Sequence, residues 1–215
     1  MTAWNRFNEA AYWLLRAIYL NFLWMIFTLL GAVFFGIFPA TVAMFHISRQ
    51  WLVEKDLSLR VFKKFWRIYK AEFIKTNVFA IAFIICAYIL YIDFIFLILA
   101  DGWVNYLYPV FILLAFMYVA TLTFFFPVYV NFQLKRTQYI KQSFLIAMAS
   151  PLHFVMIIMS LTALGIVAFL LPGIVPLFTG SVMAFVTTYL TNHSIERIKI
   201  KQQKNFAKEE PFYKF

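Results

Sequence analysis

The chain has 215 residues, of which 64% are hydrophobic and 13% charged, and its mean hydropathy is +0.82. Soluble domains are about 45–50% apolar, so this chain has more apolar surface than a soluble core can bury, and an ordinary soluble fold is excluded. The formal net charge of +10 in so apolar a chain predicts a membrane protein with basic cytoplasmic loops rather than a nucleic-acid-binding protein.

The N-terminal part predicts a surface helix followed by a first membrane span. Residues 1–16 have apolar residues at helical spacing and predict an amphipathic, interfacial lead-in helix. The apolar run 17–38 would rise about 33 Å as a helix, which is enough to cross a bilayer. It is longer than the apolar core of a signal peptide, and no A-x-A cleavage site follows it.

A structural turn then separates this span from a short second helix. Gly31, Gly36 and Pro39 interrupt the apolar pattern, and the proline favours the first turn of a new helix. A helix over 39–53 would rise only about 20–24 Å, less than the ~30 Å hydrocarbon core. It either crosses with Arg49 reaching to the membrane surface or forms a re-entrant segment buried in protein.

Residues 58–75 predict an amphipathic cytoplasmic helix, with aromatic residues on one side and basic residues on the other. Two interpretations remain: a docking helix for a protein partner, or a helix in the headgroup layer that attracts anionic lipid. The pattern by itself favours the lipid interpretation. The candidate interface residues are Arg60, Phe62, Lys63, Phe65, Trp66, Arg67, Tyr69, Lys70 and Phe73.

The remaining apolar stretches predict four further spans in one all-α, polytopic membrane domain that occupies residues 1–215. The stretches are 78–100, 104–131, 145–171 and 177–195. A polar, basic tail over 196–215 follows, and we expect its end to fray.

The distribution of charge predicts the topology. The loops over 49–75 and 132–143 and the tail are basic, whereas 93–103 has two acids and no base. The positive-inside rule therefore places the basic loops and the C-terminus in the cytoplasm. Six spans place the N-terminus there as well, while five spans, with the short second helix not crossing, leave Arg6 and Arg16 outside. We favour six because no basic residue is then stranded.

Several short motifs occur in order between residues 14 and 80: Asn-x-x-Trp, a Gly-x-x-Pro-Ala turn, Arg-x-Trp and a Phe-rich basic segment. They comprise Asn21 and Trp24; Gly36, Pro39, Ala40, Thr41 and Ala43; Arg49 and Trp51; and Phe65, Tyr69, Lys70, Phe73 and Asn77. In this order and spacing they resemble the YesL family of bacterial membrane proteins. The resemblance implies a plasma-membrane protein of Gram-positive bacteria associated with ABC-type oligosaccharide uptake, and it brings no catalytic residues.

Four polar side chains in or near the spans are candidate functional groups, because a polar group in lipid is costly unless it is satisfied. Asn21 predicts an interhelical hydrogen bond worth about 0.6 kcal/mol. His46 and Arg49, one turn apart, are interpreted as a helix end that reaches the cytoplasmic interface. Asp93 is either a proton or cation site or, as we favour, a carboxylate at the outer interface.

No constellation in the sequence predicts an enzyme, a cofactor or a metal. An enzyme requires convergent groups, and His46, His153 and His193 fall in different segments without a carboxylate at motif spacing. There is no P-loop motif, and the one cysteine, Cys86, forms no intramolecular disulfide.

The expected function is therefore an interaction. The first hypothesis is an accessory subunit of an ABC oligosaccharide importer, with membrane lipid and permease subunits as partners, no nucleic acid, and oligosaccharide only through the complex. The chain lacks the Glu-Ala-Ala loop by which conducting permease subunits engage their ATPase. The alternative is a small stand-alone transporter of sugars or ions, in which the breaks at 31–39 and 172–176 flank a central site.

Overall fold

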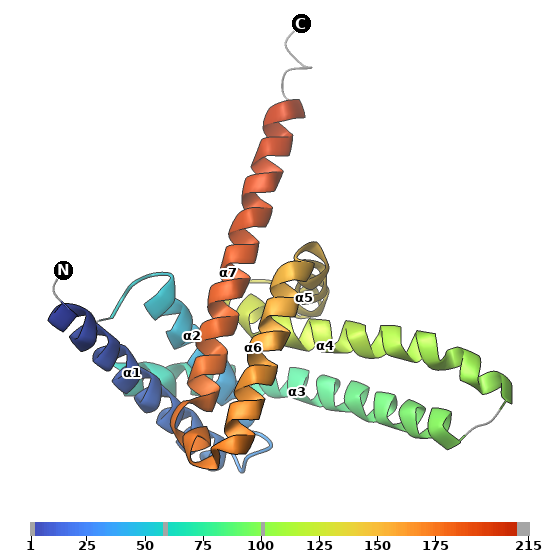
Figure 1. The fold of residues 1–215 in the computed structure, drawn as a ribbon, viewed down its shortest axis with the longest axis horizontal. Coiled ribbons are helices and arrows are strands. Elements are labelled where there is room, and N and C mark those ends of the chain that lie inside the picture. Colours follow the sequence, from blue (N-terminus) through green and yellow to red (C-terminus); the bar gives the residue numbers. More distant parts are fainter. Residues whose placement is uncertain (1–2, 58–59, 100–101, 210–215) are drawn as a thin grey trace, which may run out of the picture.

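The computed structural model describes residues 3–57, 60–99 and 102–209, and within these ranges the chain is helical, without strands. This confirms the all-helical fold class. The helices are α1 (Ala3–Leu30), α2 (Ile37–Leu52), α3 (Val61–Leu99), α4 (Tyr108–Asn131), α5 (Arg136–Ala149), α6 (Pro151–Leu170) and α7 (Val175–Glu209), with short 3-10 turns η1 (Gly102–Leu107) and η2 (Pro172–Ile174) (Figure 1).

The turn between α1 and α2 lies at residues 31–36, so the first helix ends at Leu30 and not near residue 38 as predicted. Two non-glycine residues in the turn, Ala32 and Val33, have left-handed backbone conformations with φ of 53° and 63°. Asn77 of α3 stabilises the turn, because its Nδ2 donates a hydrogen bond to the carbonyl oxygen of Phe35 at 3.0 Å.

Helices predicted as separate segments are continuous. The lead-in helix and the first span form the single helix α1. The amphipathic segment and the next span likewise form α3, whose 39 residues contain no glycine or proline to interrupt the backbone. The prediction of a distinct interfacial helix over 58–75 is thus corrected, and its residues 58–59 lie outside the described residues. The basic tail is helical up to Glu209, and residues 210–215 are outside the described range.

The predicted span over 145–171 is instead two helices. α5 ends at Ala149, and α6 begins at Pro151. Proline disfavours helical backbone in the preceding residue, and Ser150 accordingly leaves the helix with φ −134° and ψ 61°. Residues 145–149 therefore belong to α5, the helix that also contains most of the predicted basic loop over 132–143.

Four described helices are long and apolar enough to cross a membrane: α1 from Phe7 onward, α3, α4 and α6. The six-span count is not confirmed. α2 has only 16 residues, and α7 combines an apolar first half with buried threonines and basic residues. Neither α2 nor α7 is among the four candidates.

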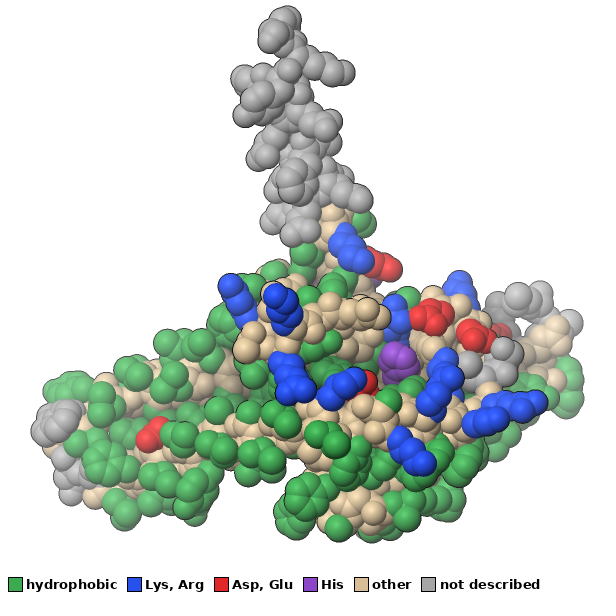
Figure 2. All heavy atoms as spheres, turned by 180° about the vertical axis from the view of Figure 1, so that it is seen from behind, with side chains coloured by type: hydrophobic (Ala, Val, Ile, Leu, Met, Phe, Trp, Pro, Cys, Tyr) green, Lys and Arg blue, Asp and Glu red, His purple; other side chains and the backbone are tan. Residues whose placement is uncertain are grey.

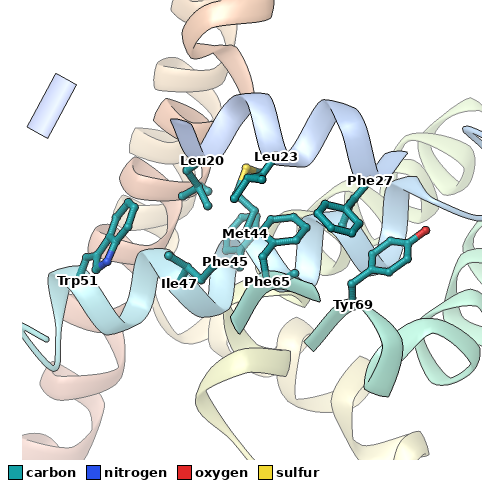
Figure 3. Packing of buried hydrophobic residues seen from close by; sticks show 12 residues of the cluster. Leu20, Leu23, Phe27, Met44, Phe45, Ile47, Trp51, Phe65 and Tyr69 are labelled. Atoms are coloured by element: carbon teal, nitrogen blue, oxygen red, sulfur yellow. The ribbon is translucent and has the colours of Figure 1, made fainter. Parts of the chain in front are cut away.

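The main core forms where α1, α2, the first half of α3 and α7 meet (Figure 3). Leu20 and Leu23 of α1 point toward Met44 and Phe45 of α2, whereas Phe27 points toward Phe65 and Tyr69 of α3. Aromatic rings dominate the contact with α3, because the Phe27 ring lies 4.9 Å from the Phe65 ring and 5.1 Å from the Tyr69 ring, centroid to centroid.

A second core lies between the end of α4 and helices α5, α6 and α7. Its buried residues include Phe124 of α4, Ala147 of α5 and Ile157 of α6. α7 contributes to both cores, so it connects the two halves of the bundle. In Figure 1 it runs across the molecule and its C-terminal part extends beyond the other helices.

The outer parts of α3 and α4 form an antiparallel hairpin that projects away from the other helices (Figure 1). We call residues 84–117 the arm. Among its described residues only Leu97 and Val104 are buried. The Phe94 and Phe111 rings stack with their centroids 5.7 Å apart, and the Tyr108 hydroxyl donates a hydrogen bond to the Leu97 carbonyl oxygen at 3.1 Å. The α3 and α4 parts of the arm therefore pack against each other.

Candidate functional site

A cavity with a volume of about 710 Å³ lies where α2, α3, α4 and the start of α5 converge. All four helices contribute charged or polar side chains, and α2, α3 and α4 also provide apolar walls. The charged and polar lining residues are His46, Arg67, Glu72, Lys75, Tyr129, Gln133, Arg136 and Tyr139, and the apolar ones include Val42, Ile68, Phe79 and Val130. This cavity is the candidate functional site.

Glu72 of α3 organises one side of the cavity. Its Oε2 accepts a hydrogen bond of 2.5 Å from the Tyr129 hydroxyl of α4, and its Oε1 pairs with Lys75 Nζ at 3.0 Å. Both carboxylate oxygens of this one acidic lining residue are therefore engaged. The Tyr139 ring of α5 packs 4.6 Å from the Tyr129 ring, and its hydroxyl donates to the Phe132 carbonyl oxygen at 3.1 Å.

Arg49 connects α2 to α4 near the cavity. Its Nε donates to Asn131 Oδ1 at 2.7 Å, and its guanidinium also pairs with Glu54. The predicted candidate Arg49 therefore joins two helices in addition to lying at a helix end. Its neighbour His46, one turn earlier, lines the cavity itself.

A basic groove of about 660 Å³ lies on the other side of Arg67. It is lined by Arg60, Lys63, Lys64, Trp66, Arg67, Lys70 and Ala71. Lys70 Nζ sits 4.2 Å above the Trp66 ring centroid, a cation–π contact. Figure 2 shows lysine and arginine side chains gathered over the central part of this face, while hydrophobic side chains cover the arm at the left. Arg67 lines both the groove and the cavity.

The aromatic side of the predicted amphipathic helix is largely occupied by contacts within the chain. Phe65 and Tyr69 are buried in the main core, and Phe73 packs against it. Phe62 and Trp66 stay exposed at their outer edges while their rings contact Phe27 at 6.0 and 5.4 Å. The sequence pattern correctly separated two faces, and within the chain the aromatic face packs mainly on α1 and α2. Contact of its exposed edges with lipid or a partner stays a prediction.

Asp93 lies apart from the cavity, on the arm. It lines an apolar groove of about 330 Å³ between α3 and α4, together with Cys86, Leu114 and Met117 among others. It forms no ion pair or hydrogen bond with another residue in the part of the chain that the structure describes. The structure therefore does not bring Asp93 together with His46 and Arg49.

The three histidines occupy two places. The rings of His153 on α6 and His193 on α7 lie 5.6 Å apart, and Arg197 Nε donates to His193 Nε2 at 3.1 Å. His46 belongs to the separate cavity. Within the described residues, no group of three or more His, Cys, Asp or Glu residues is arranged to hold a metal ion.

Sequence reasoning missed most of the cavity. Glu72, Lys75, Tyr129, Arg136 and Tyr139 were not singled out, because they come from three helices and share no sequence spacing. One signal was present: Glu72 is the single acid within the basic stretch 58–75, and such an isolated acid is a natural partner for a buried donor.

Comparison with known proteins agrees with the motifs. Residues 17–94 match the model of a family described as "Protein of unknown function, DUF624". The chain is 36% identical to the uncharacterized protein YteU of Bacillus subtilis (strain 168) over 174 residues, which is 80% of this chain and 78% of the relative. It is 30% identical to YesL of the same organism over 205 residues, covering 94% of this chain and 96% of the relative.

The chain belongs to the DUF624 family. A third relative, the uncharacterized protein YesV of Bacillus subtilis, is 30% identical over 184 residues, 85% of this chain and 88% of its own length. No solved structure matches the chain. The resemblance to the YesL family drawn from the motifs is thereby confirmed.

In this DUF624 chain the Asn-x-x-Trp motif joins helices. Asn21 Oδ1 accepts a hydrogen bond of 3.1 Å from the backbone N–H of Ser181 in α7. Trp24 Nε1 donates to Thr41 Oγ1 of α2 at 3.0 Å. Gly180 allows this approach, since a Cβ there would lie 2.8 Å from Asn21 Oδ1. The motif therefore connects α1 to both α7 and α2.

The Gly-x-x-Pro-Ala motif of the DUF624 chain has a steric role. A Cβ on Gly31 would lie 2.2 Å from Gly36 Cα, and a Cβ on Gly36 would lie 2.3 Å from the Thr28 carbonyl oxygen. Pro39 lies in the first turn of α2, where its missing N–H leaves no helical hydrogen bond unmade. These three residues thus lie where the end of α1 contacts the start of α2.

Proposed function

We propose that this protein is an integral membrane interaction protein that packs beside the permease of an oligosaccharide ABC importer and aids its assembly, stability or activity. The observation that carries the proposal is the arm, which is apolar along both helices, lies away from the bundle and holds Asp93 without a described partner. The importer as partner is what the YesL-family resemblance implies.

The chemistry of the arm favours a protein neighbour over lipid alone. Its exposed isoleucine, leucine and phenylalanine side chains suit either lipid or another helix. Asp93 differs, because a carboxylate within an apolar helix is costly unless a basic group pairs with it. The sequence 84–117 contains no lysine or arginine, so a partner that brings a basic side chain to this groove would satisfy the carboxylate.

Affinity purification of the chain from native membranes in mild detergent, followed by mass spectrometry, tests this function. We expect stoichiometric permease subunits and a sugar-binding lipoprotein with the wild-type chain. An Asp93→Asn variant should recover less permease, and a Glu9→Gln variant, which removes an exposed acid outside the arm, should recover as much as the wild type. A chain that purifies alone, or a deletion strain with unchanged oligosaccharide uptake and permease levels, would overturn the proposal.

A stand-alone transporter is the second candidate function. The observation in its favour is the cavity at the junction of α2, α3, α4 and α5, which is large and partly polar. Flux of a sugar or an ion into proteoliposomes that contain only this chain would support it. Absence of flux for the sugars and ions tested would count against it and leave the interaction function as the better account.

A further inference from the structure

The cavity between α2, α3, α4 and α5 has the chemistry of an anion site. We propose that it binds a phosphate ester, with Arg67 and Arg136 as the groups that hold the phosphate oxygens and Lys75 as an additional positive charge. This site stands whether or not the chain serves an importer. It rests on the charge of the lining, the unused donors, the start of α5 and the size of the cavity.

The lining has an excess of positive charge. Arg67, Lys75 and Arg136 face one carboxylate, Glu72, so the formal charge of the lining is +2 when His46 is neutral. Arg67 and Arg136 form no ion pair with a carboxylate in the part of the chain that the structure describes. A phosphate monoester carries about −1.5 to −2 at pH 7, which matches this excess.

The hydrogen-bonding capacity left in the cavity consists mainly of donors. Both tyrosine hydroxyls are already committed, that of Tyr129 to Glu72 and that of Tyr139 to the Phe132 carbonyl oxygen and the Leu134 N–H. Each guanidinium offers five N–H donors in a planar fork that suits phosphate oxygens. A ligand rich in acceptors is therefore preferred over one rich in donors.

The N-terminus of α5 adds to the positive electrostatic potential of the cavity. Arg136 is the first residue of this 14-residue helix, and Gln133 and Leu134 of the preceding loop also line the cavity. The N-terminus of a helix carries a partial positive charge and favours a bound anion. The helix dipole and the two arginines thus act in the same direction.

The size of the cavity indicates that the phosphate is attached to a larger group. A volume of about 710 Å³ lies in the range of small-molecule sites, about 300–1,000 Å³, and far exceeds one phosphate. Ile68, Phe79 and Val130 provide apolar walls for the remainder of the ligand. Either a soluble sugar phosphate or the headgroup of an anionic phospholipid presents this combination.

Two binding measurements on the full chain in dodecyl maltoside micelles test the site and distinguish the sources. Isothermal titration calorimetry with glucose 6-phosphate, against glucose as control, detects a soluble ester. Native mass spectrometry after addition of phosphatidylglycerol, against phosphatidylcholine, detects a lipid. The test variant is Arg67→Gln with Arg136→Gln. The matched control, Arg60→Gln with Lys63→Gln, removes the same charge from the groove but not from the cavity.

We expect saturable binding of one of the two phosphate probes and an affinity at least about tenfold lower in the test variant, because charge-assisted contacts to both guanidinia are lost. The control should stay within about twofold of the wild type. The single variant Arg136→Gln serves if the double variant does not fold. Absence of binding by both probes, or equal losses in test and control variants, would overturn the proposal.

Discussion

The main core and the arm are both rich in large apolar residues, yet they place them differently. In the most apolar stretch of α1, 33% of residues are buried within the chain, against 11% for that of α3. The Phe27 side chain is 2% exposed, whereas that of Phe96 on the arm is 57% exposed. Apolar composition alone therefore does not distinguish a helix that packs on its own chain from one that faces outward.

Small and polar residues account for the difference. The core contains close-contact glycines and interhelical hydrogen bonds such as those of Asn21 and Trp24. In a membrane, where apolar side chains gain little by leaving lipid, close packing and such bonds drive helix association. Among its described residues, the arm has neither close-contact glycines nor side-chain hydrogen bonds to the bundle. At its base, Tyr118 donates to the Phe83 carbonyl oxygen at 3.2 Å.

The largest expected effect is the loss of a close contact in the core. Gly36→Ala places a Cβ 2.3 Å from the Thr28 carbonyl oxygen, although the backbone at φ −87° and ψ −33° itself accepts alanine. Because backbone atoms must move, we expect a loss of more than about 3 kcal/mol. Thermal melting in detergent, followed by size-exclusion chromatography, measures it.

Gly165→Ala is the matched control, since a Cβ at Gly165 meets nothing within 4 Å. Alanine in place of this mid-helix glycine should leave stability unchanged or raise it by about 0.5–1 kcal/mol. Equal melting temperatures for the two glycine variants would contradict the steric account of the turn.

Truncation of an aromatic ring should affect the main core and the arm differently. Phe27→Ala removes the ring that contacts Phe65, Tyr69 and Trp66, and a loss of about 3–5 kcal/mol is expected for a buried phenylalanine. Phe96→Ala on the arm should cost less than about 1 kcal/mol in the isolated chain, because no cavity forms. Chemical denaturation in mixed micelles compares the two, and similar losses would show that the arm is packed in the isolated chain.

The smallest expected effect is that of one interhelical hydrogen bond. Trp24→Phe removes the donor to Thr41, and a double-mutant cycle with Thr41→Val should give a coupling energy of about 0.6 kcal/mol. Trp4→Phe, at an exposed position, is the control and should leave the melting temperature unchanged. A coupling energy near zero would mean that Trp24 contributes to stability through ring packing and not through its hydrogen bond to Thr41.

The helical periodicity, together with the positions where glycine and proline interrupt it, predicted most of the fold. The short α2, the turn after Leu30 and the spans of the arm follow from local pattern. The errors arose at the ends of helices. Nothing in the sequence between 61 and 99 stops a helix, so α3 is continuous, while Pro151 stops α5 within a stretch that was apolar enough to be read as one span.

The site was less accessible to prediction than the fold. His46, Arg49 and Arg67 were recognised as candidates, but their chemical neighbours Glu72, Tyr129 and Arg136 were not. A cavity depends on which faces of several helices meet, and this depends on packing between residues as far apart as Glu72 and Tyr129, 57 positions along the chain.

Local sequence is enough to predict that this protein is helical and apolar, with its basic residues gathered in a few segments, because hydropathy and charge are properties of local segments. Its motifs also determined its family. The packing of the helices, and not the local pattern, places the aromatic face of α3 inward on Phe27 and its basic face beside a cavity. The reason is physical: periodicity shows that a helix has two faces, whereas the choice of neighbour for each face depends on close contacts and hydrogen bonds between distant segments.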